Sequence, residues 1–397
     1  MIRHGLGAFF TASVLSLVLA SGAYAKKPVT VSCGETITAD TKLANDLTDC
    51  PEHGIVIGAD DITLDLNGHT VDGALAGDFN GIDNTAGHEG VTVENGSVRE
   101  FVEGVFILGT TDNRVRGVTT SHQLHAGILV AESTNVRVER NSSIDNIAGI
   151  VVAEVSDVSV EHNTVSGSEF GGIPVFRSEH VLIAENSVTG SGAAGIGLIG
   201  SDNSRVERNE ASNSPAGIVL EDGSAGNVVV GNEATGNAFD GVALDRAHDN
   251  LVTNNLLRGN GVTGVFVLGS DDNRIEKNSV IGNGDGSEAG IHLVVPPDEP
   301  GLTANRNVIS KNAVVGNEGD GILVAADQDQ NVIDGNTARE NTDDGLDVES
   351  ATTTLSKNTA NENHDLGIEA VPGVTDGGGN RASGNGNPLQ CSNVFCR

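Results

Sequence analysis

The sequence predicts an all-β fold, a right-handed parallel β-helix of about 13 stacked three-strand coils, with Asn ladders and a cap at each end. Three observations predict it. A Gly followed by Ile, Val or Leu recurs every 22 to 31 residues, short alternating apolar segments follow these glycines, and Asn recurs once per unit. The repeat glycines are Gly81, Gly104, Gly127, Gly149, Gly172, Gly195, Gly217, Gly241, Gly264, Gly290, Gly321, Gly345 and Gly367.

The chain begins with a predicted secretory signal peptide, residues 1–25. Basic Arg3 precedes an apolar run from Ala8 to Ala20, and the small-residue pattern Ala23-Tyr24-Ala25 follows it. The run is too short for a membrane span, and no other stretch approaches the roughly 20 apolar residues that a spanning helix needs. We therefore expect a secreted, periplasmic or cell-surface protein without a transmembrane segment.

The next segments are a predicted N-terminal cap, residues 26–54, the β-helix, residues 55–371, and a C-terminal cap, residues 372–397. The ends of a solenoid expose strand edges that must be covered. The cysteines fall as one pair in each cap, and export permits disulfides, so we predict two local bonds. These are Cys33 with Cys50, and Cys391 with Cys396.

Each unit of the repeat contains three strand signatures. The first follows the Gly, as in Gly241-Val242-Ala243-Leu244, where alternate apolar residues indicate a strand. The other two begin near asparagines. Stacked asparagines can hydrogen-bond along the rod and tolerate the left-handed turn conformation, so we interpret two series as structural ladders. These are Asn141, Asn163, Asn186, Asn209, Asn232, Asn255, Asn278, Asn312, Asn336 and Asn358, and Asn237, Asn260, Asn283, Asn317, Asn341 and Asn363.

Composition limits the partners. The chain carries 22 basic and 55 acidic residues, a net charge of −33. Nucleic acid is excluded because binding to phosphates needs a basic surface. An anionic polymer would be repelled unless a divalent cation or a local basic site intervened. The chain has no Trp and a single Tyr, Tyr24, so a sugar site would have to use Phe, carboxylates and amides.

The outward residues of the first strand form a mostly apolar stripe. Such a stripe indicates a covering segment, a partner or self-association, between which the sequence does not decide. Its members are Phe106, Leu129, Val151, Pro174, Gly197, Val219, Ala243, Phe266, His292, Leu323, Asp347 and Glu369.

The three-strand unit, the Asn series and the segment Ile62-Thr63-Leu64-Asp65-Leu66-Asn67-Gly68-His69-Thr70-Val71 resemble the pectin-lyase-like superfamily, over roughly residues 55–385. The resemblance implies a right-handed parallel β-helix. The superfamily includes pectate and alginate lyases, uronan epimerases, galacturonan hydrolases, tailspikes and adhesins, so it implies no single activity. The Asp-Pro-His-Asp signature of alginate epimerases and the paired Asp motifs of galacturonan hydrolases are absent.

One constellation could carry uronate chemistry. Alignment on the repeat Gly brings six carboxylates, one Arg and one His together over three coils. We expect a calcium ion to neutralise a uronate while Arg246 or His248, beside Asp245, abstracts the adjacent proton. The predicted metal ligands are Glu221, Asp222, Asp249, Asp271 and Asp272. The alternative interpretation is that Asp249 and Asp272 are turn formers.

Three further groups carry weaker signals. His292 lies on the outward face beside the longest interval between repeat glycines. His122 and His125 lie close together, but no further metal ligand accompanies them. Asp343, Asp344 and Asp347 form an acidic turn that could bind calcium or be solvated charge.

Two functions follow from these patterns. The leading hypothesis is a secreted protein that binds or processes an extracellular polysaccharide, by calcium-assisted lyase or epimerase chemistry on uronate residues. The competing hypothesis is a non-catalytic structural or adhesive surface protein. The sequence leaves both open, and with them whether the protein is an enzyme.

Overall fold

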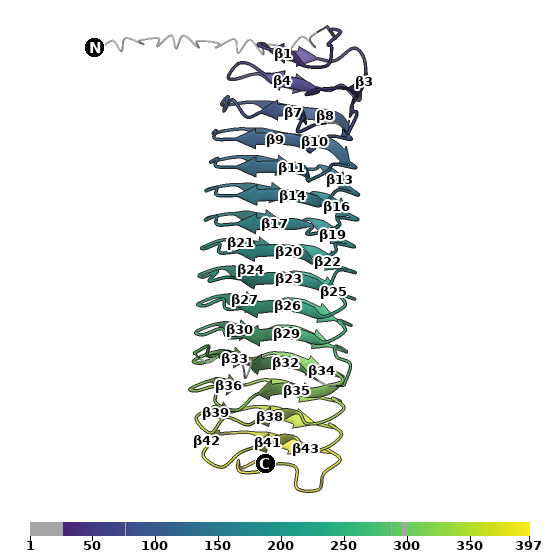
Figure 1. Ribbon diagram of the computed structural model, residues 1–397. Helices are drawn as coiled ribbons and strands as arrows, with labels where there is room; N and C mark the ends of the chain where they lie inside the picture. The colour runs from purple at the N-terminus through teal and green to yellow at the C-terminus, as the bar shows by residue number, and fades with distance from the viewer. Residues whose placement is uncertain (1–26, 76, 287, 296–298, 300) are drawn as a thin grey trace, which may run out of the picture.

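The computed structural model is a parallel β-solenoid, a straight rod of stacked coils that runs from β1 at one end to β43 at the other (Figure 1). The structure describes residues 27–75, 77–286, 288–295, 299 and 301–397. In these residues the regular elements are strands, with no helix, and the long sheet has 15 strands, so the rod has 15 coils where about 13 were predicted. The predicted signal peptide lies outside the described residues, and the described part of the chain contains no helix that could cross a membrane.

The first strands of successive coils form the long parallel sheet. In the order of the sheet they are β1 (Glu35–Ile37), β4 (Ile55–Ile57), β7 (Asn80–Asn84), β9 (Glu103–Leu108), β11 (Ala126–Ala131), β14 (Ala148–Ala153), β17 (Ile173–Phe176), β20 (Ala194–Ile199), β23 (Ala216–Glu221), β26 (Asp240–Asp245), β29 (Thr263–Leu268), β32 (Glu288–Val294), β35 (Gly319–Val324), β38 (Leu346–Val348) and β41 (Ile368–Ala370).

The second strands of the coils stack in the same parallel manner. They are β2 (Thr41–Lys42), β5 (Thr63–Asp65), β8 (Thr92–Arg99), β10 (Arg114–Ser121), β12 (Arg137–Glu139), β15 (Ser159–Glu161), β18 (Leu182–Ala184), β21 (Arg205–Glu207), β24 (Val228–Val230), β27 (Leu251–Thr253), β30 (Arg274–Glu276), β33 (Val308–Ser310), β36 (Val332–Asp334), β39 (Thr354–Ser356) and β42 (Thr375–Gly378). We call the connection from a long-sheet strand to the following second strand the first turn.

The third strands complete each coil, and β8 and β10 run through both the second and the third positions. The remaining third strands are β3 (Leu47–Cys50), β6 (Thr70–Gly73), β13 (Ser142–Ile144), β16 (Thr164–Ser166), β19 (Ser187–Thr189), β22 (Glu210–Ser212), β25 (Glu233–Thr235), β28 (Leu256–Arg258), β31 (Ser279–Ile281), β34 (Ala313–Val315), β37 (Thr337–Arg339), β40 (Thr359–Asn361) and β43 (Arg381–Ser383).

Strand alternation fills the interior with apolar side chains. In β26, Val242 and Leu244 point inward and are fully buried, while Ala243 lies on the outer face. The repeat Gly is the second residue of this strand. A Cβ atom on Gly241 would lie 2.7 Å from the carbonyl oxygen of Gly264 in the next coil, so only Gly fits. Burial of one aliphatic side chain is worth about 1.5–3 kcal/mol, and stacking repeats it in every coil.

The predicted Asn ladders are present. The Oδ1 atom of Asn209 accepts the backbone N–H of Asn186 at 2.9 Å, and its Nδ2 atom donates to the Ile183 carbonyl at 2.9 Å. The two predicted series continue to Asn380 and Asn385. A third ladder, which the sequence analysis did not identify, lies at the first turn and contains Asn227, Asn250, Asn273, Asn307 and Asn331.

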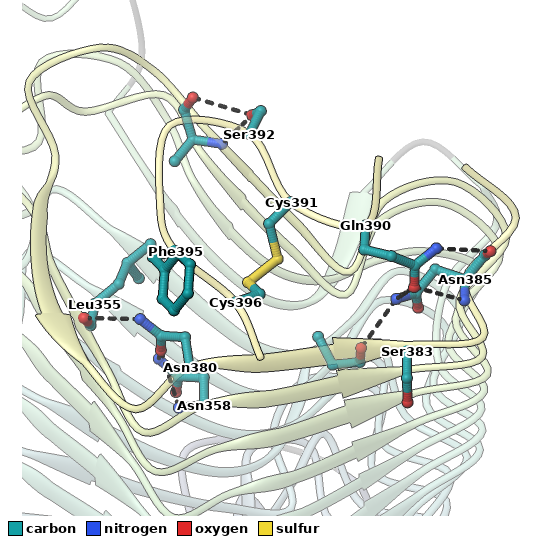
Figure 2. Close-up of a disulfide and its surroundings, with 12 residues drawn as sticks. Leu355, Asn358, Asn380, Ser383, Asn385, Gln390, Cys391, Ser392, Phe395 and Cys396 are labelled. Atoms are coloured by element: carbon teal, nitrogen blue, oxygen red, sulfur yellow. Dashed lines mark hydrogen bonds between the residues drawn. A yellow bond between two sulfur atoms is a disulfide. The ribbon is translucent and has the colours of Figure 1, made fainter. Parts of the chain in front are cut away.

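Both predicted disulfides are present, one at each end of the rod. Residues 26–54 contain the whole first coil, β1 to β3, and residues 372–397 contain β42 and β43, so both end segments contribute strands to the stack. Beyond β43 the chain folds back across the last coil (Figure 2). There the Gln390 side-chain oxygen accepts the Asn385 amide at 2.9 Å and ends the Asn ladder.

Candidate functional site

The sequence-predicted constellation lies at the first turn of three neighbouring coils. Asp245 is in register with Glu221 in the preceding coil, and His248 pairs with Ala225. The alignment on the repeat Gly therefore placed these residues in the correct coils. Their contacts, however, divide the constellation into two groups.

The first group surrounds Arg246. Its Nη2 atom lies 3.2 Å from Asp245 and 3.8 Å from Asp222, and its Nη1 atom lies 3.6 Å from Glu299. Burial raises the pKa of Asp245, an effect that Arg246 partly offsets. Burial also raises the pKa of Glu221, and the neighbouring Asp222 and Asp245 add to the rise. Three carboxylates hold the guanidinium, so it acts here as a fixed positive charge.

The second group surrounds Asp271 and Asp272. Arg306 contacts both carboxylates, with its Nη2 atom 2.6 Å from Asp272, and the Thr303 hydroxyl donates to Asp271 at 2.8 Å. The hydrogen bond from Arg306 lowers the pKa of Asp272. These oxygens therefore already have donors. Arg306 lies within the longest interval between repeat glycines, from Gly290 to Gly321, and this irregular spacing concealed its place in the coil.

His248 links the two groups without offering a free base. Its Nδ1 atom accepts the backbone N–H of Asp271 at 3.0 Å, so the proton of a neutral ring sits on Nε2. Asp249 is exposed and has a φ of 57°, and Asp272 has a φ of 60°, the left-handed conformation of turn formers. In this geometry neither His248 nor Arg246 presents a lone pair for proton abstraction.

The described carboxylates that could jointly bind a metal ion lie elsewhere. Asp320, Asp343 and Asp344 each offer an oxygen within 4.8 Å of the others, which Glu221, Asp222, Asp249, Asp271 and Asp272 do not achieve as a set. Burial raises the pKa of Asp344 to about 8 and that of nearby Asp347 to about 7. The acidic turn predicted from the sequence contains Asp343, Asp344 and Asp347 but not Asp320, which lies one coil away.

The two histidine signals have separate partners. His292 is 7% exposed, lies against Glu288 and meets the Phe266 ring edge-on, and burial lowers its pKa. His125 is bonded to Glu103, and this hydrogen bond raises the pKa of His125. His122 is an exposed turn residue with a φ of 57°. Among the described residues, His122 and His125 share no ligand.

A polar groove of about 690 Å³ runs along the first turns from β7 to β20, and it was not predicted from the sequence. Its floor includes hydroxyls at one position in three successive coils, Thr111, Thr134 and Ser156. Four successive coils each add a carboxylate. The spacing of these polar residues by 22 or 23 was visible in the sequence, but the concave shape was not. The carboxylates are Glu132, Glu154, Glu179 and Asp202.

The outward residues of the apolar stripe lie opposite one another in successive strands of the long sheet, as the sequence predicted. It is hollowed at Gly197, where a pocket of about 290 Å³ is lined by Phe170, Pro174 and Val219 among others. Glu221 borders this pocket as well as the Arg246 group. The polar groove, the Arg246 group and the apolar pocket therefore occupy one side of the rod.

Comparison with known proteins identifies the fold. No curated protein sequence matches the chain. The model of the right-handed β-helix region matches residues 43–179, 148–295 and 302–386. A periplasmic alginate epimerase is similar in structure, with 18% identity, a TM-score of 0.56 and coverage of 77% of this chain and 78% of that one.

Two further solved structures are also similar. The A-module of a mannuronan C-5 epimerase from Azotobacter vinelandii has 15% identity and a TM-score of 0.52, covering 88% of this chain and 90% of that one. A surface adhesin of Streptococcus pneumoniae has 11% identity and a TM-score of 0.56, covering 77% and 83%. At these identities the likeness concerns the fold.

Proposed function

Because the chain belongs to the right-handed β-helix family, we propose that it binds an extracellular polysaccharide lengthwise along the polar groove of the first turns. The observation that carries this proposal is the groove itself, about 690 Å³ with hydroxyls and carboxylates repeated coil by coil. Such side chains accept and donate the hydrogen bonds that sugar hydroxyls offer. The stacked coils hold them at a spacing of about 4.8 Å, on a scaffold that needs little rearrangement.

The similar structures support the class of ligand. Two of them are epimerases of alginate or mannuronan, which are polysaccharides, and the third is an adhesin. One similar protein is periplasmic and another lies on a cell surface, which fits the two disulfides of this chain. A secreted, periplasmic or surface location is therefore part of the proposal.

Uronate processing is the second candidate. The observation that favours it is the Arg246 group, in which Glu221 and Asp245 have raised pKa values beside a guanidinium and an apolar pocket. A calcium ion could bind these carboxylates, and Arg246 would face the uronate carboxylate. For His248 to act as the base, its Nδ1 atom would have to release the Asp271 backbone.

Binding and turnover can be measured on one panel of neutral, amino-bearing and uronate polysaccharides. We expect titration calorimetry to detect binding of at least one polymer. Thr134→Trp, which fills the groove floor, should abolish it. Thr164→Trp, at an exposed position of β16 outside the groove, should leave it unchanged. Binding that survives Thr134→Trp, or no binding to any polymer, would contradict the proposal.

The same panel separates catalysis from adhesion. Ultraviolet absorbance from unsaturated uronates, lost on chelation and in Arg246→Ala, would support calcium-assisted lyase chemistry. Isomerised uronates detected by NMR would support an epimerase. Binding without either product would favour a non-catalytic adhesive protein.

A further inference from the structure

The charges in the polar groove restrict which polysaccharide it can hold. Five carboxylates line it, Glu89, Glu132, Glu154, Glu179 and Asp202, against one guanidinium, that of Arg177. Arg177 lies 2.6 Å from Glu154, so its charge is already compensated. The groove therefore presents a strongly negative surface to its ligand.

Three of these carboxylates have no side-chain partner in the part of the chain that the structure describes. Among the described residues, no hydrogen bond or ion pair holds the side chains of Glu89, Glu132 and Glu179, and Glu132 and Glu179 are exposed. Asp202 uses one oxygen to accept the Ala225 backbone N–H at 2.9 Å. Glu179 and Asp202 occupy equivalent positions in adjacent coils, whose backbones lie about 4.8 Å apart, and their like charges repel each other.

Basic side chains elsewhere on the rod do not neutralise the negative charge of the groove. On the adjoining second strands Arg114 is engaged with Glu139, Arg116 with Glu94 and Arg205 with Glu207. Arg137 on β12 is the exception among the described residues of these strands, with no carboxylate within ion-pair distance. Arg246, farther along the first turns, is held by acidic neighbours. The whole chain carries a net charge of −33. A polyanion approaching the groove would meet repulsion at every coil.

We propose that the ligand of the groove is a polysaccharide of amino sugars with free, protonated amines. This inference rests on the proposed function and names its substrate class. In the four coils from β11 to β20, one carboxylate per coil, at a spacing near the length of one sugar unit in an extended chain, would meet one ammonium group per sugar. The floor hydroxyls of Thr134 and Ser156 would bond to the sugar hydroxyls. Charge-assisted hydrogen bonds of this kind are stronger than neutral ones.

The test compares two oligomers that differ only in charge. Titration with a fully deacetylated glucosamine oligomer and with its fully N-acetylated counterpart isolates the ammonium groups. We expect the deacetylated oligomer to bind at least about tenfold more tightly at low salt, and the difference to shrink as salt screens the charges. Calcium should not be required.

Two double variants test whether the tighter binding of the deacetylated oligomer depends on the carboxylates of the groove. Glu132→Gln with Glu179→Gln should weaken binding of the deacetylated oligomer about tenfold. Glu210→Gln with Glu233→Gln removes the same charge from adjacent coils on the third strands, outside the groove, and should have little effect. Equal losses in both double variants would indicate unspecific attraction and overturn the inference.

The remaining outcomes distinguish the inference from the proposed function. Equal binding of both oligomers, or stronger binding of a polyuronate with calcium, would overturn the amino-sugar inference and leave polysaccharide binding intact. Binding of none of the oligomers, none of the polyuronates and none of the neutral polysaccharides would remove both.

Discussion

Several carboxyl groups in the last coils have raised pKa values, and their surroundings explain why. Asp344 is 4% exposed, and its carboxyl accepts the Leu366 backbone N–H at 2.6 Å while sharing a hydrogen bond with Glu369. Asp320 lies in the preceding coil, where burial raises its pKa to about 6. Each ionised carboxylate in this group makes ionisation of the next one less favourable, because the side chains share one face of the last coils.

Asp344 should make the protein less stable as the pH rises above neutral. Its pKa is about 8 in the folded protein and near 3.8 in the unfolded chain, so the folded state binds more protons between these values. Stability is therefore lost as the pH rises through the folded pKa. We expect the urea midpoint to fall between pH 7 and pH 9, and Asp344→Asn to flatten this dependence.

The control for this prediction is Glu362→Gln, an exposed position in the same part of the rod. It should keep the wild-type pH dependence. His292 does not confuse the comparison, because burial lowers its pKa and it stays neutral above pH 7. If Asp344→Asn kept the full fall in midpoint, the retained proton would have to belong to another group.

At the residue scale, sequence reasoning found the coils of the candidate site and missed part of its chemistry. Repeat alignment could place Asp245 beside Glu221, since in-register residues of adjacent coils always meet. It could not assign Arg306 to Asp272, because the two are 34 residues apart across an irregular interval. Nor could it show that His248 Nδ1 is used by the backbone, which depends on the side-chain rotamer.

At the scale of the strand, the repeat Gly is required by space and not by an unusual backbone angle. Gly241 lacks a positive φ, yet a Cβ atom there would approach the Gly264 carbonyl oxygen to 2.7 Å and the Asn260 side-chain nitrogen to 2.9 Å. Gly197 differs, because it faces outward in the apolar pocket and its nearest atom would be Ile199 Cδ1 at 3.3 Å. Substitutions of Gly241 and Gly197 therefore serve as a test and its control for the steric role of the repeat Gly.

We expect Gly241→Ala to lower the free energy of unfolding by about 1–3 kcal/mol, the typical cost of overpacking. Gly197→Ala should stay within about 0.5 kcal/mol of wild type. Urea unfolding followed by circular dichroism measures both. Equal midpoints for the two variants would show that the coil can shift to admit a methyl group, and would remove the steric explanation of the repeat.

Because space requires a Gly in each coil, the repeat Gly could be used to predict the coils from the sequence. The repeat Gly marked the coils that begin at Gly81 and later, and these predictions are confirmed. Two coils were missed at the N-terminal end. Gly54-Ile55 begins one of them, 27 residues before Gly81. The coil of β1 begins at Gly34-Glu35, where Glu stands in place of the Ile, Val or Leu that follows the other repeat glycines. The end coils vary in sequence because each stacks on only one neighbour.

At the scale of the whole molecule, each coil contacts only the coils beside it, so stability is a sum of local terms. The backbone pairings run from β1 to β41 without an interruption in the long sheet. The two disulfides lie at the ends, where a coil has one neighbour and opening costs least. Each disulfide should therefore protect its own end and leave the middle of the rod unchanged.

Removing Cys33–Cys50 with a Cys33→Ser, Cys50→Ser double variant should cost about 3 kcal/mol locally, the chain-entropy value for a loop of about this length. Hydrogen exchange should accelerate in β1 to β6 and stay at wild-type rates in β20 to β31. Cys391→Ser with Cys396→Ser is the matched control, and should accelerate exchange in β41 to β43 alone. Acceleration spread evenly along the rod would mean that the coils unfold as one unit, because a local constraint can change exchange everywhere only if opening is global.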